Sequence, residues 1–200
     1  QYAAVGSSIV VSNIIDQGVA RMEDFEKVLG YRPAFRTDIT ERDHPSKIII
    51  AIGDPRVRDV IYHSCREAGV SFFTLVHETA YVAESASIGE GSLVAPLAFV
   101  GPLARISPNV IINVSASIGH DTVIEQSSVI SPLVAINGGA VCGRCATIGA
   151  GAVLFPGSSI GAFTKVAAGA VVKRSFDSGY LLHGNPADGR KMFDVPTPLE

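Results

Sequence analysis

A repeat that begins with residues 76–94, which read VHETAYVAESASIGEGSLV, decides the fold. Counting in sixes from Val76 reaches an aliphatic residue, or in one case a cysteine, at every step as far as Val172. The series is Val76, Val82, Ile88, Val94, Val100, Ile106, Ile112, Ile118, Ile124, Ile130, Ile136, Cys142, Ile148, Leu154, Ile160, Val166 and Val172. A fixed six-residue period without a register break is typical of a parallel β-helix.

The repeat also has a second small position. Four residues after each member of the series comes a small or modest side chain, such as Ala80 or Ala98, which we expect to let the chain turn a tight corner. Three hexads then make one triangular coil of about 18 residues, and neighbouring coils pair about 4.8 Å apart. Residues 76–171 form 16 hexads, which predicts a little over five coils and a prism about 25 Å tall. A β-sandwich is excluded, because its strands alternate with period two and vary in length.

Composition narrows the class of protein. Hydrophobic residues make up 47% of the 200 residues and charged residues 18%, as in a soluble globular protein with a substantial core. The net charge of −3 gives no reason to expect a nucleic acid or an anionic membrane as partner. No apolar run approaches the roughly 20 residues that span a bilayer. No secretory signal is evident, so the cytoplasm is the expected compartment.

The three cysteines, Cys65, Cys142 and Cys145, form no metal-binding or disulfide framework. Cys142 occupies an inward position of the repeat, where a small core residue is expected. The Cys142-x-x-Cys145 spacing suggests zinc only where a second pair of ligands exists, and the sequence has none. We therefore expect no metal site.

Residues 1–75 differ in kind and predict a small Rossmann-like α/β domain with a parallel sheet. Strands are expected over residues 2–6, 47–53 and 70–76, with a helix beginning after residue 7. A second helix is expected from Asp54-Pro55, an N-cap followed by proline, to Ala68-Gly69.

Ligands of such sheets bind beyond the carboxyl ends of the strands. In this chain those ends lie near Gly6 and Gly53. The half is too short for a full dinucleotide fold, so it predicts a site for a nucleotide or sugar no larger than a mononucleotide. The repeat and the segment after it, residues 76–200, form the second predicted domain, which ends in a short strand over residues 180–183, a turn over residues 184–188 and a tail.

His120 is the candidate for chemistry within the repeat, because most neighbouring side chains are small. Histidine is the usual general base near neutral pH. Asp121 adjoins it and is suited to orient the ring or to stabilise its protonated form. Asn113 lies seven residues earlier on the preceding side of the coil. A solvated corner histidine is the alternative, and the residues alone leave the choice open.

The other histidines are weaker candidates. His77 stands at the start of the repeat and His183 near its end, while His44 and His63 lie in the α/β half, where surface positions are expected.

Six features, in this order, resemble one family: the bacterial hexapeptide acyltransferases that acetylate sialic acid or the amino group of nucleotide-linked amino sugars. The features are the α/β half, Ile52-Gly53-Asp54 with Arg58, Val76-His77-Glu78-Thr79-Ala80, the hexad repeat, Asn113 with His120-Asp121, and Gly184-Asn185-Pro186-Ala187. The resemblance covers nearly the whole chain, and the order of the features is more specific than hexads alone.

The resemblance implies a left-handed β-helix, a homotrimer, and acetyl-CoA as co-substrate in the groove between neighbouring prisms. It implies that His120 is the general base and Asp121 its supporting carboxylate. The residues implied for acceptor binding are Asn113, Gly6, Ser7, Gly53, Asp54 and His77. Those implied for acetyl-CoA binding are Gly139, Gly151, Ala168 and Gly169 beside the pantetheine arm, and Lys173, Arg174, Pro186 and Arg190 near the phosphates.

The chain departs from the family pattern at three places. The first turn reads Gly6-Ser7-Ser8-Ile9-Val10, without the family's second glycine and its histidine. Val129 stands where nucleotide-sugar members have a second histidine, and Asp188 follows the Pro-Ala pair where Lys or Arg is usual.

Two other functions remain as alternatives. A β-helix hydratase of the carbonic-anhydrase type needs three converging imidazoles, whereas the repeat has His120 and, at its edge, His77. A non-catalytic trimeric scaffold is the second. The sequence leaves open which sugar is acylated, on nitrogen or oxygen, whether it carries a nucleotide, and which acyl group is moved.

Overall fold

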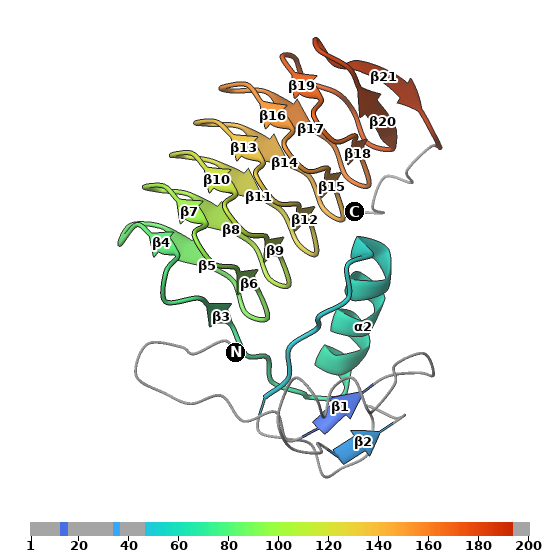
Figure 1. Cartoon of the computed structure of the whole chain (residues 1–200). Helices are drawn as coiled ribbons and strands as arrows, with labels where there is room; N and C mark the ends of the chain where they lie inside the picture. The colour runs from blue at the N-terminus through green and yellow to red at the C-terminus, as the bar shows by residue number, and fades with distance from the viewer. Residues whose placement is uncertain (1–12, 16–33, 37–46, 194–200) are drawn as a thin grey trace.

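The computed structural model describes residues 13–15, 34–36 and 47–193, and its main body is a triangular prism of stacked coils (Figure 1). Paired residues of neighbouring coils lie 18 positions apart: Ser117 pairs in parallel with Phe99 on one side and with Ala135 on the other. The predicted parallel β-helix is thus confirmed, and its coil geometry is consistent with the left-handed sense implied by the resemblance.

The prism has three faces, each a parallel sheet of two-residue strands. The first face contains β3 (Leu75–Val76), β6 (Leu93–Val94), β9 (Ile111–Ile112), β12 (Val129–Ile130), β15 (Thr147–Ile148), β18 (Lys165–Val166), β20 (Tyr180–His183) and, antiparallel at its end, β21 (Asp188–Lys191). The second face contains β4 (Tyr81–Val82), β7 (Phe99–Val100), β10 (Ser117–Ile118), β13 (Ala135–Ile136), β16 (Val153–Leu154) and β19 (Val171–Val172). The third face contains β5 (Ser87–Ile88), β8 (Arg105–Ile106), β11 (Val123–Ile124), β14 (Val141–Cys142) and β17 (Ser159–Ile160).

The six-residue series forms the core. From Val94 onward its members are at most 3% exposed, and Ile112, Ile130 and Leu154 are fully buried. Each such side chain contributes about 1.5–3 kcal/mol of burial once the next coil covers it. The seven parallel strands of the first face, from β3 to β20, give about six turns, compared with the predicted five and a fraction, because β20 adds a last coil after the repeat ends.

Three corners join the faces, and each is four residues long. The first corner joins the first and second faces (77–80, 95–98, 113–116, 131–134, 149–152, 167–170), the second joins the second and third (83–86, 101–104, 119–122, 137–140, 155–158), and the third returns to the first (89–92, 107–110, 125–128, 143–146, 161–164). The small residue that ends a corner is buried and fills the core, as Ala98 does. The preceding residue turns the chain with a positive φ, in nine cases without glycine: Leu97, Leu103, Asn109, Ser115, Asp121, Ser127, Leu133, Cys145 and Phe163.

The C-terminal segment closes the end of the prism. Phe176 bridges to Ile160 of the third face, and the backbone of Val171 on the second face bonds to Gly184 and Ala187. The predicted strand over residues 180–183 is β20, and the predicted turn follows at residues 184–187, with a cis peptide bond before Pro186. Strand β21 was not predicted.

The described part of the N-terminal half is smaller than the predicted domain. Strands β1 (Asn13–Ile15) and β2 (Ala34–Arg36) pair in parallel, so the helix expected after residue 7 is wrong where β1 lies, and its Ile14-Ile15 pair favours a strand. The strand expected over residues 2–6 and the residues Gly6 and Ser7 lie outside the described residues.

The expected strand over residues 47–53 is wrong beyond a single parallel bridge between Ile48 and Phe72. The reason is that the carbonyls of Ile50 and Ile52 accept hydrogen bonds from the Arg58 side chain instead of from a neighbouring strand. Of the strand expected over residues 70–76, Leu75 and Val76 form β3, which belongs to the β-helix.

The helix α2 (Pro55–Glu67) confirms the predicted helix and its N-cap, because Asp54 Oδ1 accepts from the backbone N–H groups of Arg56 and Val57. The helix lies along the third corner of the prism (Figure 1). At its N-terminal end Cys145 Sγ is 3.7 Å from the Pro55 carbonyl, and at its C-terminal end the Tyr62 hydroxyl donates to Glu90 at 2.8 Å. It therefore runs against the direction in which the coils rise.

Candidate active site

His120 and Asp121 stand on the second corner, between β10 and β11. The side chains are 69% and 55% exposed, and His120 Nδ1 is 2.8 Å from Asp121 Oδ2. Asp121 has φ of 56°, a conformation that Asp tolerates better than most residues. Because a carboxylate only accepts hydrogen bonds, Nδ1 is the donor in this contact, and in the neutral ring Nε2 then presents a lone pair. The predicted pair is thus in contact.

The imidazole ring of His120 lies against Gly138, one coil further on. A Cβ built on Gly138 would be 2.4 Å from His120 Nε2 and 2.5 Å from Cε1, so only glycine leaves room for the ring in this position. The next residue, Gly139, donates its backbone N–H to the His120 carbonyl at 2.8 Å. Sequence reasoning missed Gly138, although its position, three hexads after His120, was available as a signal.

The second corner ends in two exposed cations. Arg174 lies 54 positions, or three coils, after His120, and Lys173 precedes it. Three coils correspond to about 14 Å along the prism. Lys173 Nζ is 5.3 Å from the centre of the Phe155 ring, while the Arg174 guanidinium is 4.5 Å from that of Phe176. Arg174 also lies 3.8 Å from Asp188, the residue that replaces the family's usual Lys or Arg.

The remaining predicted residues of the repeat divide between two corners. Gly139 shares the second corner with His120. Asn113, Gly151, Ala168, Gly169 and His77 lie on the first corner, with the second face between the two sets. His77 is two coils before Asn113, and its Nδ1 accepts from the Thr79 backbone N–H at 3.2 Å. One chain therefore does not bring the two sets together.

The other predicted residues lie outside both corners. Asp54 uses its carboxylate as the cap of α2, and Gly53 beside it is exposed. Pro186 is exposed in the turn after β20, and Arg190 is exposed in β21.

Apolar side chains gather on the second face and the two corners that border it. The rings of Tyr81 and Phe99 stack at 5.3 Å while remaining 58% and 40% exposed. Leu97 and Leu133 of the first corner and Leu103 of the second corner are each more than half exposed. Exposed apolar side chains gathered on one side of a molecule are typical of a protein–protein interface.

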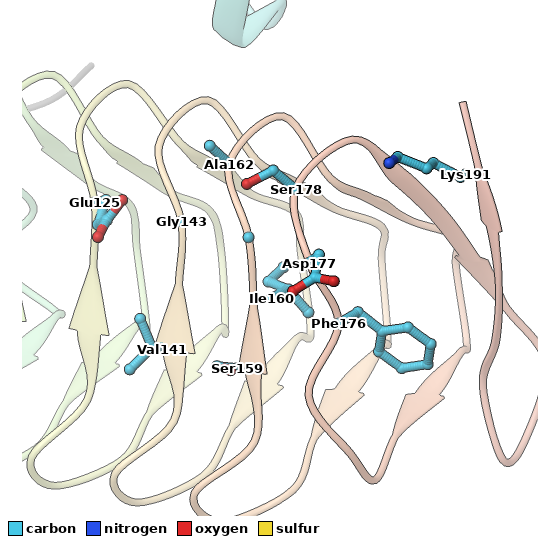
Figure 2. A pocket seen from close by; sticks show the side chains of 11 residues that line it. Glu125, Val141, Gly143, Ser159, Ile160, Ala162, Phe176, Asp177, Ser178 and Lys191 are labelled. Atoms are coloured by element: carbon cyan, nitrogen blue, oxygen red, sulfur yellow. The ribbon is translucent and has the colours of Figure 1, made fainter. Parts of the chain in front are cut away.

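A shallow groove lies on the third face near its C-terminal end (Figure 2). Its lining includes Glu125, Gly143, Asp177, Ser178 and Lys191, but none of the predicted site residues. The imidazole of His120 is 69% exposed and stands on a corner outside this groove.

The described residues contain no group of three or more His, Cys, Asp or Glu side chains placed to hold a metal ion. The cysteines at 142 and 145 are buried, and burial raises the pKa of each thiol to about 12, so both stay protonated at neutral pH. No helix in the described part of the chain has the length and apolar character that crossing a bilayer requires.

Neither a protein-family model nor a curated protein sequence matches the chain. Solved structures do. PerB from Caulobacter crescentus, solved in complex with CoA and GDP-perosamine, is 32% identical over 81% of this chain and 80% of its own, with a TM-score of 0.77. The acetyltransferase domain of PglB from Neisseria gonorrhoeae, also solved with acetyl coenzyme A, is 29% identical over 80% of both chains, with a TM-score of 0.76.

WeeI from Acinetobacter baumannii is 27% identical over 80% of this chain and 79% of its own, with a TM-score of 0.74. The similarity to PerB extends over most of both chains, and the sequence identity of 32% indicates a shared family as well as a shared fold. The chain is an acetyltransferase, and it belongs to the family of sugar acetyltransferases that includes perosamine N-acetyltransferase.

Proposed function

We propose that the protein transfers the acetyl group of acetyl-CoA to the amine of a nucleotide-linked amino sugar, with His120 as the general base. The observation that carries the proposal is the His120–Asp121 pair, which stands on the same corner as a basic C-terminal end. The likeness to PerB, which was solved with CoA and GDP-perosamine, supports the two substrate classes.

In the proposed reaction the neutral amine attacks the thioester carbonyl carbon, the C–N bond forms and the C–S bond breaks. His120 Nε2 takes the proton that the amine loses and returns it to the sulfur, which leaves as the CoA thiol. The Asp121 carboxylate, 2.8 Å from Nδ1, fixes the tautomer with a free Nε2 and stabilises the imidazolium between the two proton transfers. The imidazole is neutral again after each turnover.

The distance along the prism from His120 to Lys173 and Arg174 matches the length of the pantetheine arm of acetyl-CoA. A pantetheine arm is comparable in length to about four residues of extended chain, or about 14 Å. That length matches the three coils, about 14 Å, that separate His120 from Lys173 and Arg174. With the thioester at His120, the pyrophosphate therefore comes level with the two cations, which suit phosphate oxygens.

The division of the predicted residues between two corners supports an active site between subunits. In a homotrimer whose apolar second faces take part in the interfaces, the first corner of one chain can face the second corner of its neighbour. Asn113, Gly151 and Gly169 of one chain would then meet His120 of another. A Cβ on Gly151 or Gly169 would meet nothing within 4 Å, so these corners offer bare backbone to a substrate arm. Residues 1–75 would bind the nucleotide.

The proposal is tested by incubating the purified protein with acetyl-CoA and a panel of UDP-, GDP- and TDP-linked amino sugars. Release of CoA is followed with a thiol reagent, to which the buried cysteines of the protein contribute little background. The His120→Ala variant should lose about 10²–10⁴-fold in kcat, the usual effect of removing a general base. It should sediment as the same trimer as the parent protein.

Three results would contradict the proposal. An unchanged kcat in His120→Ala excludes this residue as the base. Thiol release with hydroxyl sugars but with no amino sugar replaces N-acetylation by O-acetylation, while a monomer in sedimentation removes the site between subunits.

A further inference from the structure

Arg58 in the second turn of α2 is fully buried, although it carries a charge. Its Nη1 donates to the carbonyls of Ile50 and Ile52, the latter at 3.1 Å. Its Nη2 donates to the backbone carbonyl of Asn109 at 2.8 Å and to the side-chain Oδ1 of the same residue at 2.7 Å. One guanidinium thus joins the segment before α2, the helix itself and the third corner of the β-helix.

Asn109 also donates a hydrogen bond to Arg58. Its Nδ2 donates to the Arg58 carbonyl at 3.2 Å and to Ser127 Oγ, one coil further on, at 2.8 Å. The residue is fully buried and has φ of 59°, so the corner turn itself aims the amide at the helix. The two side chains form a reciprocal clasp between the N-terminal half and the prism.

The clasp contains no carboxylate among the described residues. Burial lowers the pKa of Arg58 to about 10, which still leaves the guanidinium charged at neutral pH. Its Nε has no hydrogen-bond partner in the part of the chain that the structure describes. A buried ionic group is frequently replaceable by an apolar one without loss of stability. Stability is therefore a weak explanation for Arg58, whereas its fork of donors to three carbonyls fixes a geometry.

The segment whose position Arg58 fixes is the one that leads into α2. Ile50 and Ile52 lead directly to Gly53 and Asp54, the two residues of this segment for which the family resemblance implies acceptor binding. Gly53 is exposed, and a Cβ on it would meet nothing within 4 Å, so this turn faces open space. The clasp holds the residues that immediately precede this turn.

A second set of contacts holds the direction of α2. Asp59 forms an ion pair with Arg144 and accepts from Gln126 Nε2 at 3.0 Å, and both partners belong to the third corner. Because consecutive residues Arg58 and Asp59 are each held, the helix can neither slide along the corner nor rotate about its axis without breaking one set.

We propose that Arg58 is a positioning residue for acceptor binding: through the carbonyls of Ile50 and Ile52 it holds the Gly53–Asp54 turn at a fixed place relative to the coils. The inference rests on the proposed function and deepens it, since the acceptor, and not acetyl-CoA, is the substrate affected. Arg58 itself touches neither substrate.

The test compares steady-state kinetics of Arg58→Lys and Asn109→Gly with the parent protein, using the amino sugar nucleotide that the panel identifies. The lysine keeps the charge but loses the fork, and the glycine keeps the positive φ and the backbone carbonyl but removes the amide. Each should raise KM for the acceptor about tenfold with kcat and KM for acetyl-CoA unchanged, as expected when binding energy common to the ground state and the transition state is lost. Arg66→Met is the matched control, because Arg66 is an exposed arginine of the same helix and should leave all three constants unchanged.

Acceptor binding is also measured by calorimetry in the His120→Ala background, where turnover is about 10²–10⁴-fold slower. A roughly tenfold weaker Kd on adding Arg58→Lys supports the inference independently of turnover. A loss of kcat at constant KM, or equal loss of affinity for both substrates, overturns it while the proposed function stands. Absence of transfer by the parent protein with every acceptor overturns the proposed function, and the inference with it.

Discussion

Replacing Gly138 by alanine puts one methyl group where the His120 ring lies. The new Cβ would be 2.4 Å from Nε2 and 2.5 Å from Cε1, whereas an ordinary contact needs at least 3.4 Å, so the ring must move by 1.0 Å or more. A misplacement of about 1 Å costs about 10²-fold in rate when the displaced atom takes part in proton transfer. We therefore expect kcat to fall about 10²-fold.

The fold should tolerate the change. The φ of Gly138 is outside the left-handed region, so alanine suits the backbone, and the ring is exposed enough to swing away. The thermal midpoint should stay within about 2 °C of the parent value. Kinetics of CoA release and differential scanning calorimetry measure the two quantities.

A double-mutant cycle isolates the mechanism. If Gly138 acts by leaving room for the imidazole, adding Gly138→Ala to His120→Ala should cost no further activity. A parental kcat in the single variant, or a second full loss in the double variant, refutes the placement of the base. Gly69→Ala is the control, because it should lower stability without changing kcat. Gly69 has φ of +75°, so alanine there should cost about 1 kcal/mol of stability, and the new methyl group would meet no atom within 4 Å.

Three other substitutions probe the carboxylate beside the base, the basic end of the corner and the ion pair of α2. Asp121→Asn, which keeps a residue suited to the positive φ, should lower kcat by about 10–10²-fold, less than in a buried triad because the carboxylate is 55% exposed; stopped-flow thiol release measures it. Lys173→Ala should raise KM for acetyl-CoA about three- to tenfold and weaken its dependence on ionic strength, whereas an unaltered salt profile would remove Lys173 from the phosphate site. Burial alone would raise the pKa of Asp59, but the hydrogen bonds from Arg144 and Gln126 and the charge of Arg144 lower it, so the stability contributed by ionised Asp59 is present at neutral pH and is lost as the pH falls below about 4. Thermal midpoints between pH 7 and pH 3 should consequently fall less steeply in Asp59→Asn than in the parent, and parallel curves would contradict this.

The repeat was predictable because one physical rule acts at every coil. An inward aliphatic residue is useful only at a fixed period, so the series from Val76 to Val172 specifies core, register and coil length together. The small corner residues could be predicted in position, but the residue that makes the turn could not. Ala98 and its equivalents fill the core, and the turn is made by residues such as Leu97 that take φ near 58° at a cost in strain. No composition rule identifies such a leucine, because its conformation is imposed by the strands on either side.

The polar residues of the candidate site could be picked out from the sequence, but their surroundings could not. His120 and Asp121 stood out as polar groups among small ones, and their contact follows from adjacency. The role of Gly138 depends on what lies one coil away, which becomes visible once the 18-residue coil is applied to each position. The expected strand over residues 47–53 was wrong for a reason local sequence does not contain: Arg58, several residues later, takes the carbonyls that a strand would use.

The closed end of the prism has a consequence for solubility. Two-residue strands stacked in parallel leave a row of unpaired backbone groups on the last coil of every face, which is a template for joining prisms end to end into fibres. Here Phe176 covers the third face, residues 184 and 187 cover the second, and the antiparallel β21 covers the first. The C-terminal segment that carries Arg174 and the Pro186 turn thereby prevents end-to-end association of prisms. A truncation of this segment made to study substrate binding would also expose the last coil to polymerisation.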